Sequence, residues 1–196
     1  MRKQLAGTAL LTAAALFMVN LPDAEQTDSG VNQQQKKRDS HSEVVFMPEG
    51  QVPVSFVETI DGDTIKVIVM GKIETVRYLL VGTPESKKPG TCVQPYAKQA
   101  FERNNELVQS GLLTLEVEQG NTRDAYGRLL AYVYVDGKSV QEMLLQEGLA
   151  RVGYIMNPPY KYLKLYKDDE NLARRSQINI WSRSGLVTNW GFDGFE

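Results

Sequence analysis

Residues 75–85 read Thr-Val-Arg-Tyr-Leu-Leu-Val-Gly-Thr-Pro-Glu, and the rest of the chain is organised around this stretch. Its apolar residues predict a strand that ends at the Gly-Thr-Pro turn, and Arg77 interrupts the apolar run. An arginine is seldom tolerated on a half-buried strand unless its planar guanidinium meets a carboxylate or a phosphate. Glu85 follows the turn, on what we expect to be an exposed loop. The stretch therefore predicts an anion-binding arginine close to a free carboxylate.

Two further motifs flank this stretch. Residues 61–64 (Asp-Gly-Asp-Thr) put two carboxylates on a tight turn before a strand, which is a common way to present oxygen ligands to a hard cation. Residues 124–128 (Asp-Ala-Tyr-Gly-Arg) place a second arginine at a turn directly before another strand. Taken alone, each motif is more simply a turn or a solvated charge. Together with residues 75–85 they supply the groups that phosphodiester hydrolysis requires.

Composition excludes several kinds of chemistry. The chain has 196 residues, of which 42% are hydrophobic and 23% charged, as in an ordinary globular protein. Because the chain has a single cysteine, Cys92, it cannot form an internal disulfide. Because it has a single histidine, His41, it cannot form a histidine-rich metal cluster, and neither residue belongs to a motif typical of a catalytic triad. The formal net charge of −2 argues against a protein that coats DNA non-specifically. An enzyme built from these residues would use carboxylates, arginines and a bound metal.

The amino-terminal part of the chain resembles a secretory signal. Residues 1–24 combine Arg2 and Lys3 with an apolar stretch at 5–19 that is short for a bilayer span. Ala24 could be the last residue removed, but Pro22 occupies a position where a small residue is preferred, so an uncleaved anchor is the alternative. We therefore expect a secreted or cell-surface protein.

Three segments follow the signal. Residues 25–50 are polar and predict a disordered linker, because they contain too few apolar side chains to fold alone. Residues 51–184 contain the folded domain, and residues 185–196 form a carboxy-terminal tail. Within the domain, alternation and helical spacing predict five strands, at 52–60, 64–70, 73–81, 112–118 and 129–135, and three helices, at 93–110, 140–147 and 163–173.

The order of these elements predicts the fold class. Short connections make the first three strands antiparallel, and Ser139 with Glu142 forms a capping box before the second helix. A five-strand meander interrupted by one helix suggests an α+β protein with a closed, five-stranded OB-type β-barrel and three helices. Such barrels often bind oligonucleotides, although fold analogy alone says nothing about chemistry.

Five motifs, taken together, resemble the thermonuclease (staphylococcal-nuclease-like) family. They occur in the family's order and spacing and cover about residues 52–184. The resemblance implies an OB barrel with three helices and calcium-dependent cleavage of DNA and RNA that yields 3′-phosphorylated products. The motifs are found at 60–64, 76–85, 124–134, 146–150 and 179–182.

The resemblance also implies a role for individual residues. Arg77 and Arg128 match the two arginines that hold the scissile phosphate, and Glu85 matches the proposed general base that activates water. Asp63 matches a metal-ligating aspartate, and Thr83 matches a residue that ligates calcium through its main-chain carbonyl. Positive charges fixed around a phosphorane are usually a large term in this kind of catalysis, so the carried-over roles agree with the chemistry of the residues.

The chain departs from the family pattern at the metal site. The family has an aspartate immediately before Thr-Pro-Glu, whereas this chain has Gly82. Calcium affinity depends largely on the charge of the ligands, so we expect weaker calcium binding with Asp63 as the family-matched carboxylate. Asp61 is interpreted as shaping the turn before the strand.

Other departures concern the substrate. Ala125 replaces a lysine that is frequent in the family, and Met156 replaces an aromatic residue. Tyr126 and Tyr154 match tyrosines that lie against the bound nucleotide. Base stacking on tyrosine tolerates any base, which is typical of a nuclease without strong base preference.

Three functions stay open at this point. The first is a monomeric, metal-dependent nuclease that acts on DNA and RNA without a protein partner. The second is a non-catalytic nucleic-acid-binding module whose metal site is impaired at Gly82, and the third is a purely structural secreted domain. Glu85 favours the nuclease, because a binding module gains nothing from a negative charge beside a phosphate.

Overall fold

The computed structural model describes residues 50–86, 93–120, 122–156 and 158–194. The predicted signal, the polar linker except Gly50, and the residues His41 and Cys92 lie outside these ranges. No helix in the described part of the chain is long and apolar enough to cross a membrane.

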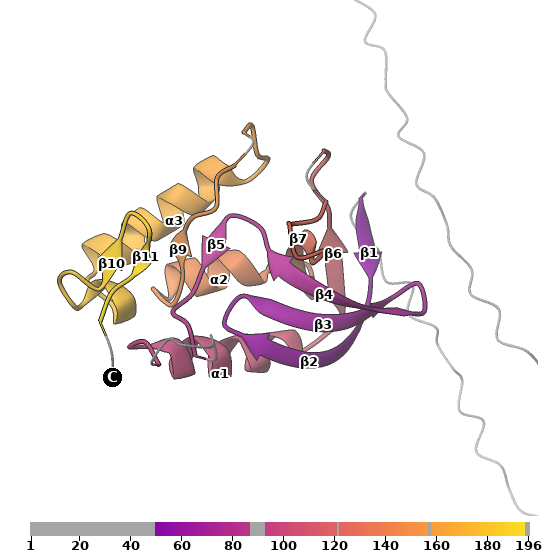
Figure 1. Cartoon of the computed structure of the whole chain (residues 1–196), viewed down its shortest axis with the longest axis horizontal. Helices are drawn as coiled ribbons and strands as arrows, with labels where there is room; N and C mark the ends of the chain where they lie inside the picture. Colours follow the sequence, from indigo (N-terminus) through magenta and orange to yellow (C-terminus); the bar gives the residue numbers. More distant parts are fainter. Residues whose placement is uncertain (1–49, 87–92, 121, 157, 195–196) are drawn as a thin grey trace, which may run out of the picture. The chain divides into compact units, whose positions relative to one another are not determined.

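The described residues form a mixed α+β structure (Figure 1), as predicted. Its three α-helices are α1 (Ala97–Val108), α2 (Val140–Gln146) and α3 (Leu163–Arg175), and a short 3-10 helix η1 follows at Asn179–Trp181. The longer strands are β2 (Ser55–Asp61), β3 (Thr64–Val69), β4 (Lys72–Tyr78), β6 (Leu113–Glu116) and β7 (Leu129–Val135). The shorter strands are β1 (Gln51–Pro53), β5 (Val81–Gly82), β8 (Lys138–Ser139), β9 (Arg151–Val152), β10 (Val187–Thr188) and β11 (Gly191–Phe192).

The main sheet has the strand order β1-β6-β7-β4-β3-β2, and β8 pairs with β7. Strands β2, β3 and β4 are antiparallel neighbours, as the short connections predict. The prediction of a simple meander is wrong for one pair of strands, because β7 runs parallel to its neighbour β4. A parallel neighbour needs a long connection, and the chain supplies it by passing through α1 and β6 before β7 returns beside β4.

The sheet is not closed into the expected barrel. Among the described residues no ladder joins β1 to β2, the two edge strands. These strands follow each other in the chain with Val54 between them, and the Val54 N–H donates to the Leu113 carbonyl at 3.0 Å. Pro53 has no N–H to continue a ladder. The segment predicted as one strand therefore changes partner at Val54, from β6 to β3.

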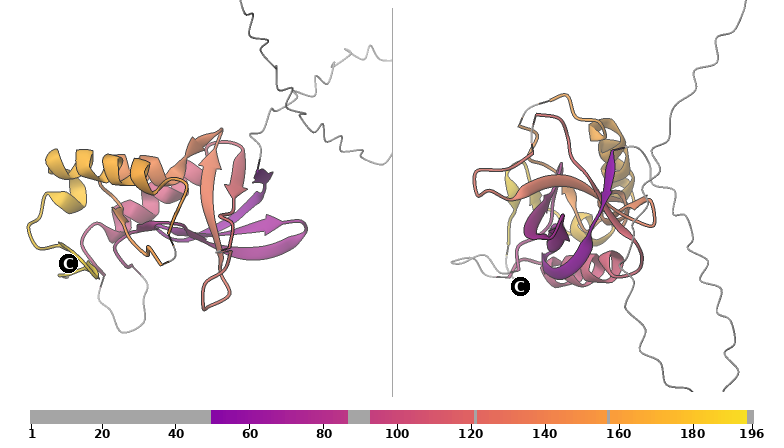
Figure 2. Two further views of the ribbon diagram at one scale, coloured as in Figure 1. Left: turned by 90° about the horizontal axis from the view of Figure 1, so that it is seen from above. Right: turned by 90° about the vertical axis from the view of Figure 1, so that its right-hand side faces the viewer.

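The core lies between the sheet and the helices. Strands β3, β4 and β7 contribute fully buried side chains, among them Ile65, Val76 and Val133. Helix α2 begins at the predicted cap, where Ser139 Oγ accepts the Glu142 N–H at 3.2 Å. Figure 2 shows α3 along the outer side of α2. Helix α1 packs against β2, and α2 packs against β7.

A buried carboxylate, Glu116, links the end of β6 to the segment before α3. Its side chain is only 12% exposed and accepts hydrogen bonds from the hydroxyl groups of Tyr134 (2.9 Å) and Tyr162 (3.0 Å) and from Lys161 Nζ (2.5 Å). Burial alone would raise the pKa of Glu116, but these three donors outweigh burial and lower it from its usual value of 4.5.

Replacing Glu116 with glutamine is expected to reduce the free energy of unfolding at pH 7 by about 1–2 kcal/mol, because a neutral amide pairs more weakly with these donors. A carboxylate with a lowered folded pKa stabilises the protein above its unfolded pKa, and this contribution is lost as pH falls through the folded value. The difference between the wild type and Glu116→Gln should therefore shrink below about pH 4.5. Urea unfolding of both proteins at pH 7 and pH 4 measures this difference in the free energy of unfolding.

The control is Glu58→Gln, which alters an ion pair with Lys66 in which the glutamate side chain is 51% exposed. It should change stability by less than about 0.5 kcal/mol. An equal loss at pH 7 and pH 4 in Glu116→Gln would contradict the assignment of charge-assisted hydrogen bonds to this carboxylate.

Candidate active site

Asp63 and Arg77 form a buried ion pair at the end of the β3–β4 ribbon. Thr64 pairs with Arg77 across the two strands, which brings the arginine beside the β2–β3 turn. Arg77 Nη2 lies 3.1 Å from Asp63 Oδ2, and the two side chains are 9% and 8% exposed. The same oxygen accepts the Thr83 N–H at 2.8 Å. The structure thus brings together three of the predicted site residues.

The guanidinium of Arg77 is held on several sides. Its Nη1 donates to the Tyr78 carbonyl at 3.0 Å, and its Cζ lies 4.7 Å from the centre of the Tyr154 ring. Burial alone would lower the pKa of Arg77, but the attraction of Asp63 and the neighbouring groups outweighs burial and raises it. The site therefore holds a permanent, oriented positive charge.

Asp61 is a second carboxylate in this site. Its Oδ1 accepts the Asp63 N–H at 3.1 Å, so it shapes the turn as expected. Burial, followed by the charge of Asp63 and a hydrogen bond between the two side chains, raises the pKa of Asp61 to about 7. The signal in the sequence was the Asp-Gly-Asp spacing, which puts two acidic side chains on one tight turn.

Gly82 lies beside the same cluster, in β5. It pairs with Arg151 of β9, and the chain after β9 then places Tyr154 next to Gly82. A Cβ atom on Gly82 would lie 3.0 Å from Tyr154 Cε2 and 3.9 Å from Arg77 Nη2. A side chain at this position would therefore point into the space around the Arg77 guanidinium.

Glu85 follows Thr83 by two residues and is half-buried. Its carboxylate has no hydrogen-bond or ion-pair partner among the residues that the structure describes. Its main chain is well held: the Glu85 N–H donates to Gln94 Oε1 at 2.8 Å, and the Glu85 carbonyl accepts the Gln94 N–H at 3.0 Å. Sequence analysis missed Gln94, because a polar residue before a helix carries no distinctive pattern.

Arg128 belongs to a separate turn. Its Nε donates to Asp124 Oδ2 at 2.6 Å, and its Cζ lies 5.5 Å from the centre of the Tyr126 ring. Burial alone would raise the pKa of Asp124, but the hydrogen bonds and the charge of Arg128 lower it. Within the described ranges, no hydrogen bond or ion pair joins Arg128 to Asp63 or Arg77.

The strand register nevertheless places Arg128 close to the first cluster along the sheet. The next residue, Leu129, pairs with Val76 across the parallel β4–β7 ladder, and Val76 precedes Arg77. Arg77 itself pairs with Leu130, so Arg128 lies just before the amino end of β7, two register positions from Arg77 near the carboxyl end of β4. Tyr126 is 87% exposed and Tyr154 is 60% exposed, so both predicted nucleotide contacts present their rings to solvent.

The oxygen groups around Asp63 fit a hard cation. Ca²⁺ prefers carboxylate and carbonyl oxygens, and Asp61 and Asp63 supply two carboxylates on one hydrogen-bonded turn. Asp63 retains acceptor capacity, because an ionised carboxylate accepts at about four sites. No three Asp, Glu, His or Cys side chains gather as a metal-binding group in the part of the chain that the structure describes. The residues fit a cation site of low ligand charge.

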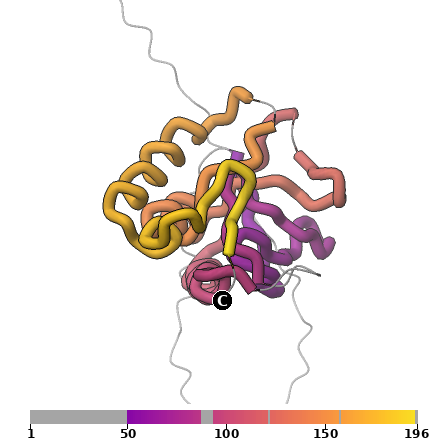
Figure 3. Tube along the Cα trace, turned by 60° about the vertical axis from the view of Figure 1, so that its left-hand side comes forward, coloured from indigo at the N-terminus to yellow at the C-terminus, as the bar shows by residue number. Residues whose placement is uncertain are grey.

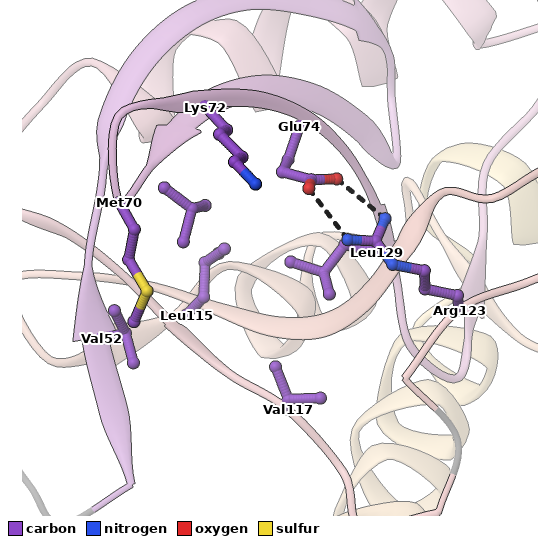
Figure 4. Close-up of a pocket in the computed structure, with 9 residues that line it drawn as sticks. Val52, Met70, Lys72, Glu74, Leu115, Val117, Arg123 and Leu129 are labelled. Carbon is purple, nitrogen blue, oxygen red and sulfur yellow. Dashed lines mark hydrogen bonds and ion pairs between the residues drawn. The ribbon is translucent and has the colours of Figure 1, made fainter.

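A separate pocket of about 360 Å³ lies at the opposite end of β4 (Figure 4). It is mainly apolar, and the ion pair between Glu74 and Arg123 borders it. The pocket includes Lys72 at the start of β4, whereas Arg77 lies near the end of that strand. None of the predicted site residues lines it, and we assign it no role. Its lining residues are Val52, Val69, Met70, Lys72, Glu74, Leu115, Val117, Arg123 and Leu129.

Comparison with known proteins gives the family. The family model described as "Staphylococcal nuclease homologue" matches residues 75–183, which contain Arg77, Glu85 and Arg128. The chain belongs to the staphylococcal nuclease family. The predicted resemblance is therefore confirmed, and this nuclease homologue has an α+β structure with three helices among its described residues.

Curated relatives of this nuclease homologue carry matching names. Endonuclease YncB of Bacillus subtilis (strain 168) is 62% identical over 143 residues, which cover 73% of this chain and 68% of that protein. The SPbeta prophage-derived endonuclease YokF of the same strain is 58% identical over 143 residues, 73% of this chain and 48% of that protein. Thermonuclease of Staphylococcus hyicus is 39% identical over 126 residues, 64% of this chain and 73% of that protein.

Proposed function

We propose that this protein hydrolyses phosphodiester bonds in DNA and RNA and leaves 3′-phosphorylated products. The observation that carries the proposal is the buried Asp63–Arg77 pair, bonded to Thr83 two residues before Glu85, whose carboxylate has no partner among the described residues. Relatives named endonuclease and thermonuclease support hydrolysis of nucleic acid by this family member.

In the proposed mechanism Arg77 and Arg128 hold the scissile phosphate. Arg77 spends one donor on the Tyr78 carbonyl and one on Asp63, so further N–H groups of its five donors are left for phosphate oxygens. Glu85 takes a proton from the water that attacks phosphorus, and the bond from phosphorus to the 5′-oxygen breaks, with a proton from solvent completing the 5′-hydroxyl and the phosphate left on the 3′-oxygen. Both arginines offset the charge that gathers on the phosphorane.

We propose Ca²⁺ as the cofactor, held by the Asp63 carboxylate and the Thr83 carbonyl, with Asp61 as an additional oxygen donor. When bound, the ion would supply positive charge beside the reacting phosphate. Gly82 leaves this site without the aspartate that the family pattern places there. A raised calcium requirement is the expected consequence.

Tyr126 and Tyr154 are proposed to contact the nucleotides. Their rings are exposed, and each lies beside one of the two phosphate-binding arginines. A tyrosine ring stacks on any base, so the proposal predicts little sequence preference. The protein is proposed to act as a monomer. Export is proposed from residues 1–24, which carry a signal-like pattern.

The second candidate function is nucleic-acid binding without cleavage. Gly82 favours this binding function, because a site that holds too little calcium would keep the arginines and tyrosines that bind substrate but would not cleave it. The two functions differ in one measurable respect, which is whether DNA is cut when calcium is saturating.

The test is cleavage of single-stranded and double-stranded DNA and of RNA by the full chain, with calcium varied from micromolar to tens of millimolar and with a chelator. Cleavage that requires calcium, with 3′ ends that a polymerase extends only after phosphatase treatment, is the expected result. Binding of the same DNA without cleavage at any calcium concentration would reject the nuclease and leave the binding module.

Gly82→Asp is expected to lower the calcium concentration that gives half-maximal rate by roughly tenfold, because a carboxylate would enter the space beside Arg77 and Asp63. The backbone of Gly82 is not in the left-handed region, and the contact at 3.0 Å is with the exposed ring of Tyr154, which can move. Calcium titration of the cleavage rate and of binding heat measures the change.

Gly82→Asn is the matched control, since it has nearly the same shape without the charge. It should leave the calcium requirement unchanged or raise it. If both substitutions shift the requirement equally, the effect comes from packing against Tyr154, and the proposed ligand position at residue 82 is wrong.

A further inference from the structure

The last part of the described chain forms a β-hairpin outside the matched family region. Strands β10 and β11 pair through Val187 with Phe192 and Thr188 with Gly191, and the Asp193 N–H donates to the Leu186 carbonyl at 2.8 Å. The family match ends at residue 183. Residues 185–196, predicted as a tail, thus contain an ordered element, which we call the C-terminal hairpin (residues 187–192). Figure 3 shows this hairpin, in yellow, returning towards earlier parts of the chain.

Gln94 joins the C-terminal hairpin to the main chain of Glu85. Its Nε2 donates to the Phe192 carbonyl at 2.8 Å, while its Oε1 accepts the Glu85 N–H at 2.8 Å. Its own N–H donates to the Glu85 carbonyl at 3.0 Å, and its carbonyl accepts the Ala97 N–H at 3.0 Å at the start of α1. Gln94 is 8% exposed, and all of its polar groups are used. One side chain therefore couples the proposed base, a helix and the hairpin.

A second contact ties the same hairpin to the other side of the site. The Cζ atom of Arg151 lies 5.8 Å from the centre of the Phe192 ring. Arg151 pairs with Gly82, the residue directly before Thr83. The C-terminal hairpin thus meets both the strand pair that precedes Glu85 and, through Gln94, the main chain of Glu85 itself. The two contacts therefore meet the same short segment, residues 82–85.

We propose that the C-terminal hairpin positions Glu85 through Gln94, and that Gln94 is a positioning residue for the hydrolysis. This inference rests on the proposed role of Glu85 as the base. Within the described part of the chain, the hydrogen bonds that hold Glu85 are those of its main chain with Gln94. A displacement of about 1 Å in a reacting group can cost roughly 10²-fold in rate, which makes such a support effective.

Two variants break the coupling at its two ends. Deleting residues 187–196 removes the Phe192 carbonyl, and Gln94→Glu keeps an acceptor for the Glu85 N–H but turns a carboxylate towards that carbonyl. Each is expected to lower kcat by roughly 10- to 100-fold with KM changed by less than about threefold. The combined variant should be no slower than the worse single variant, because both remove one interaction. If the fold losses in kcat of the two single variants multiply in the combined variant, the proposed coupling is wrong.

Trp190→Ala is the matched control within the hairpin. Its side chain is 96% exposed, so its removal leaves the hairpin backbone and the Phe192 carbonyl in place. It should keep kcat within about twofold of the natural chain. The same deletion made in a Glu85→Gln background should not lower the residual rate further, since the positioned carboxylate is already absent. A further drop in that background would show a general structural effect and overturn the proposal.

A readout without activity separates this inference from the proposed function. Amide hydrogen exchange at Glu85, followed by NMR on the full chain, should accelerate at least about tenfold in the deletion variant and in Gln94→Glu. Exchange of the Tyr78 amide, which donates to the Asp63 carbonyl, should stay as in the natural chain, as should exchange in Trp190→Ala. Unchanged exchange at Glu85 would overturn the inference. A chain that cuts no nucleic acid but shows the accelerated exchange would reject the nuclease alone.

Discussion

Glu85→Gln is expected to lower the kcat of DNA cleavage by about 10²- to 10⁴-fold, the range over which a general base contributes to rate. Glutamine keeps the size of the side chain but cannot take a proton from water. The main-chain bonds to Gln94 do not involve the carboxylate, and that carboxylate has no partner in the described ranges. The substitution should therefore leave the melting temperature and KM nearly unchanged. Single-turnover cleavage at saturating calcium measures the chemical step.

The control is Glu102→Gln, which removes a carboxylate on α1 that is 61% exposed and forms an ion pair with the exposed Lys98. Its rate should equal that of the natural chain. If Glu85→Gln keeps more than about a tenth of the rate, Glu85 orients water instead of accepting its proton, and the proposed mechanism loses its base.

Arg77→Lys is expected to lower the cleavage rate by about 10²- to 10³-fold, even though the positive charge is kept. The planar guanidinium donates to the Tyr78 carbonyl, pairs with Asp63 and lies against the Tyr154 ring at the same time. A lysine ammonium is a single point of charge and cannot meet these three partners while also holding a phosphate. Comparing kcat for Arg77→Lys with that of the natural chain tests the geometry separately from the charge.

Arg77→Leu tests the same residue through stability. Removing Arg77 leaves the buried Asp63 carboxylate without its ionic partner, with the Thr83 N–H still bonded to it, so the free energy of unfolding should fall by about 3–5 kcal/mol. Arg123→Lys is the control for both substitutions, because Arg123 also forms a forked pair, with Glu74, but is 46% exposed. It should change stability by less than about 1 kcal/mol and leave the rate unaltered. A rate loss in Arg123→Lys similar to that in Arg77→Lys would contradict a specific role for Arg77.

Local pattern was sufficient for most of the secondary structure. The alternation of apolar residues predicted β3, β4 and β7, and the Ser139 cap predicted where α2 begins, because each signal depends on neighbours in the chain. The change of partner at Val54 was not predictable, since it depends on which distant strands lie beside each edge. The open sheet and the parallel β4–β7 pair follow from that long-range arrangement.

Site prediction failed where a residue works through distant contacts. Gln94 donates to the carbonyl of Phe192, which lies 98 residues further along the chain, and nothing near Gln94 in the sequence indicates that bond. Gln141 is a second buried amide, which accepts the Val133 N–H and donates to the Ala131 carbonyl of β7. Side-chain amides carry no charge and no strong pattern, so their partners appear only after folding.

The sequence by itself determined the chemistry available to this protein: carboxylates and arginines at short motifs, a chain with one histidine and one cysteine, and glycine at position 82. These follow from residue identity and local spacing alone. Only the tertiary structure decided that Asp63, Arg77 and Thr83 share one buried hydrogen-bonded cluster, that Tyr154 lies over the arginine, and that the C-terminal hairpin supports Glu85. The physical reason is that burial and hydrogen bonding between distant segments depend on their packing, which no local pattern specifies.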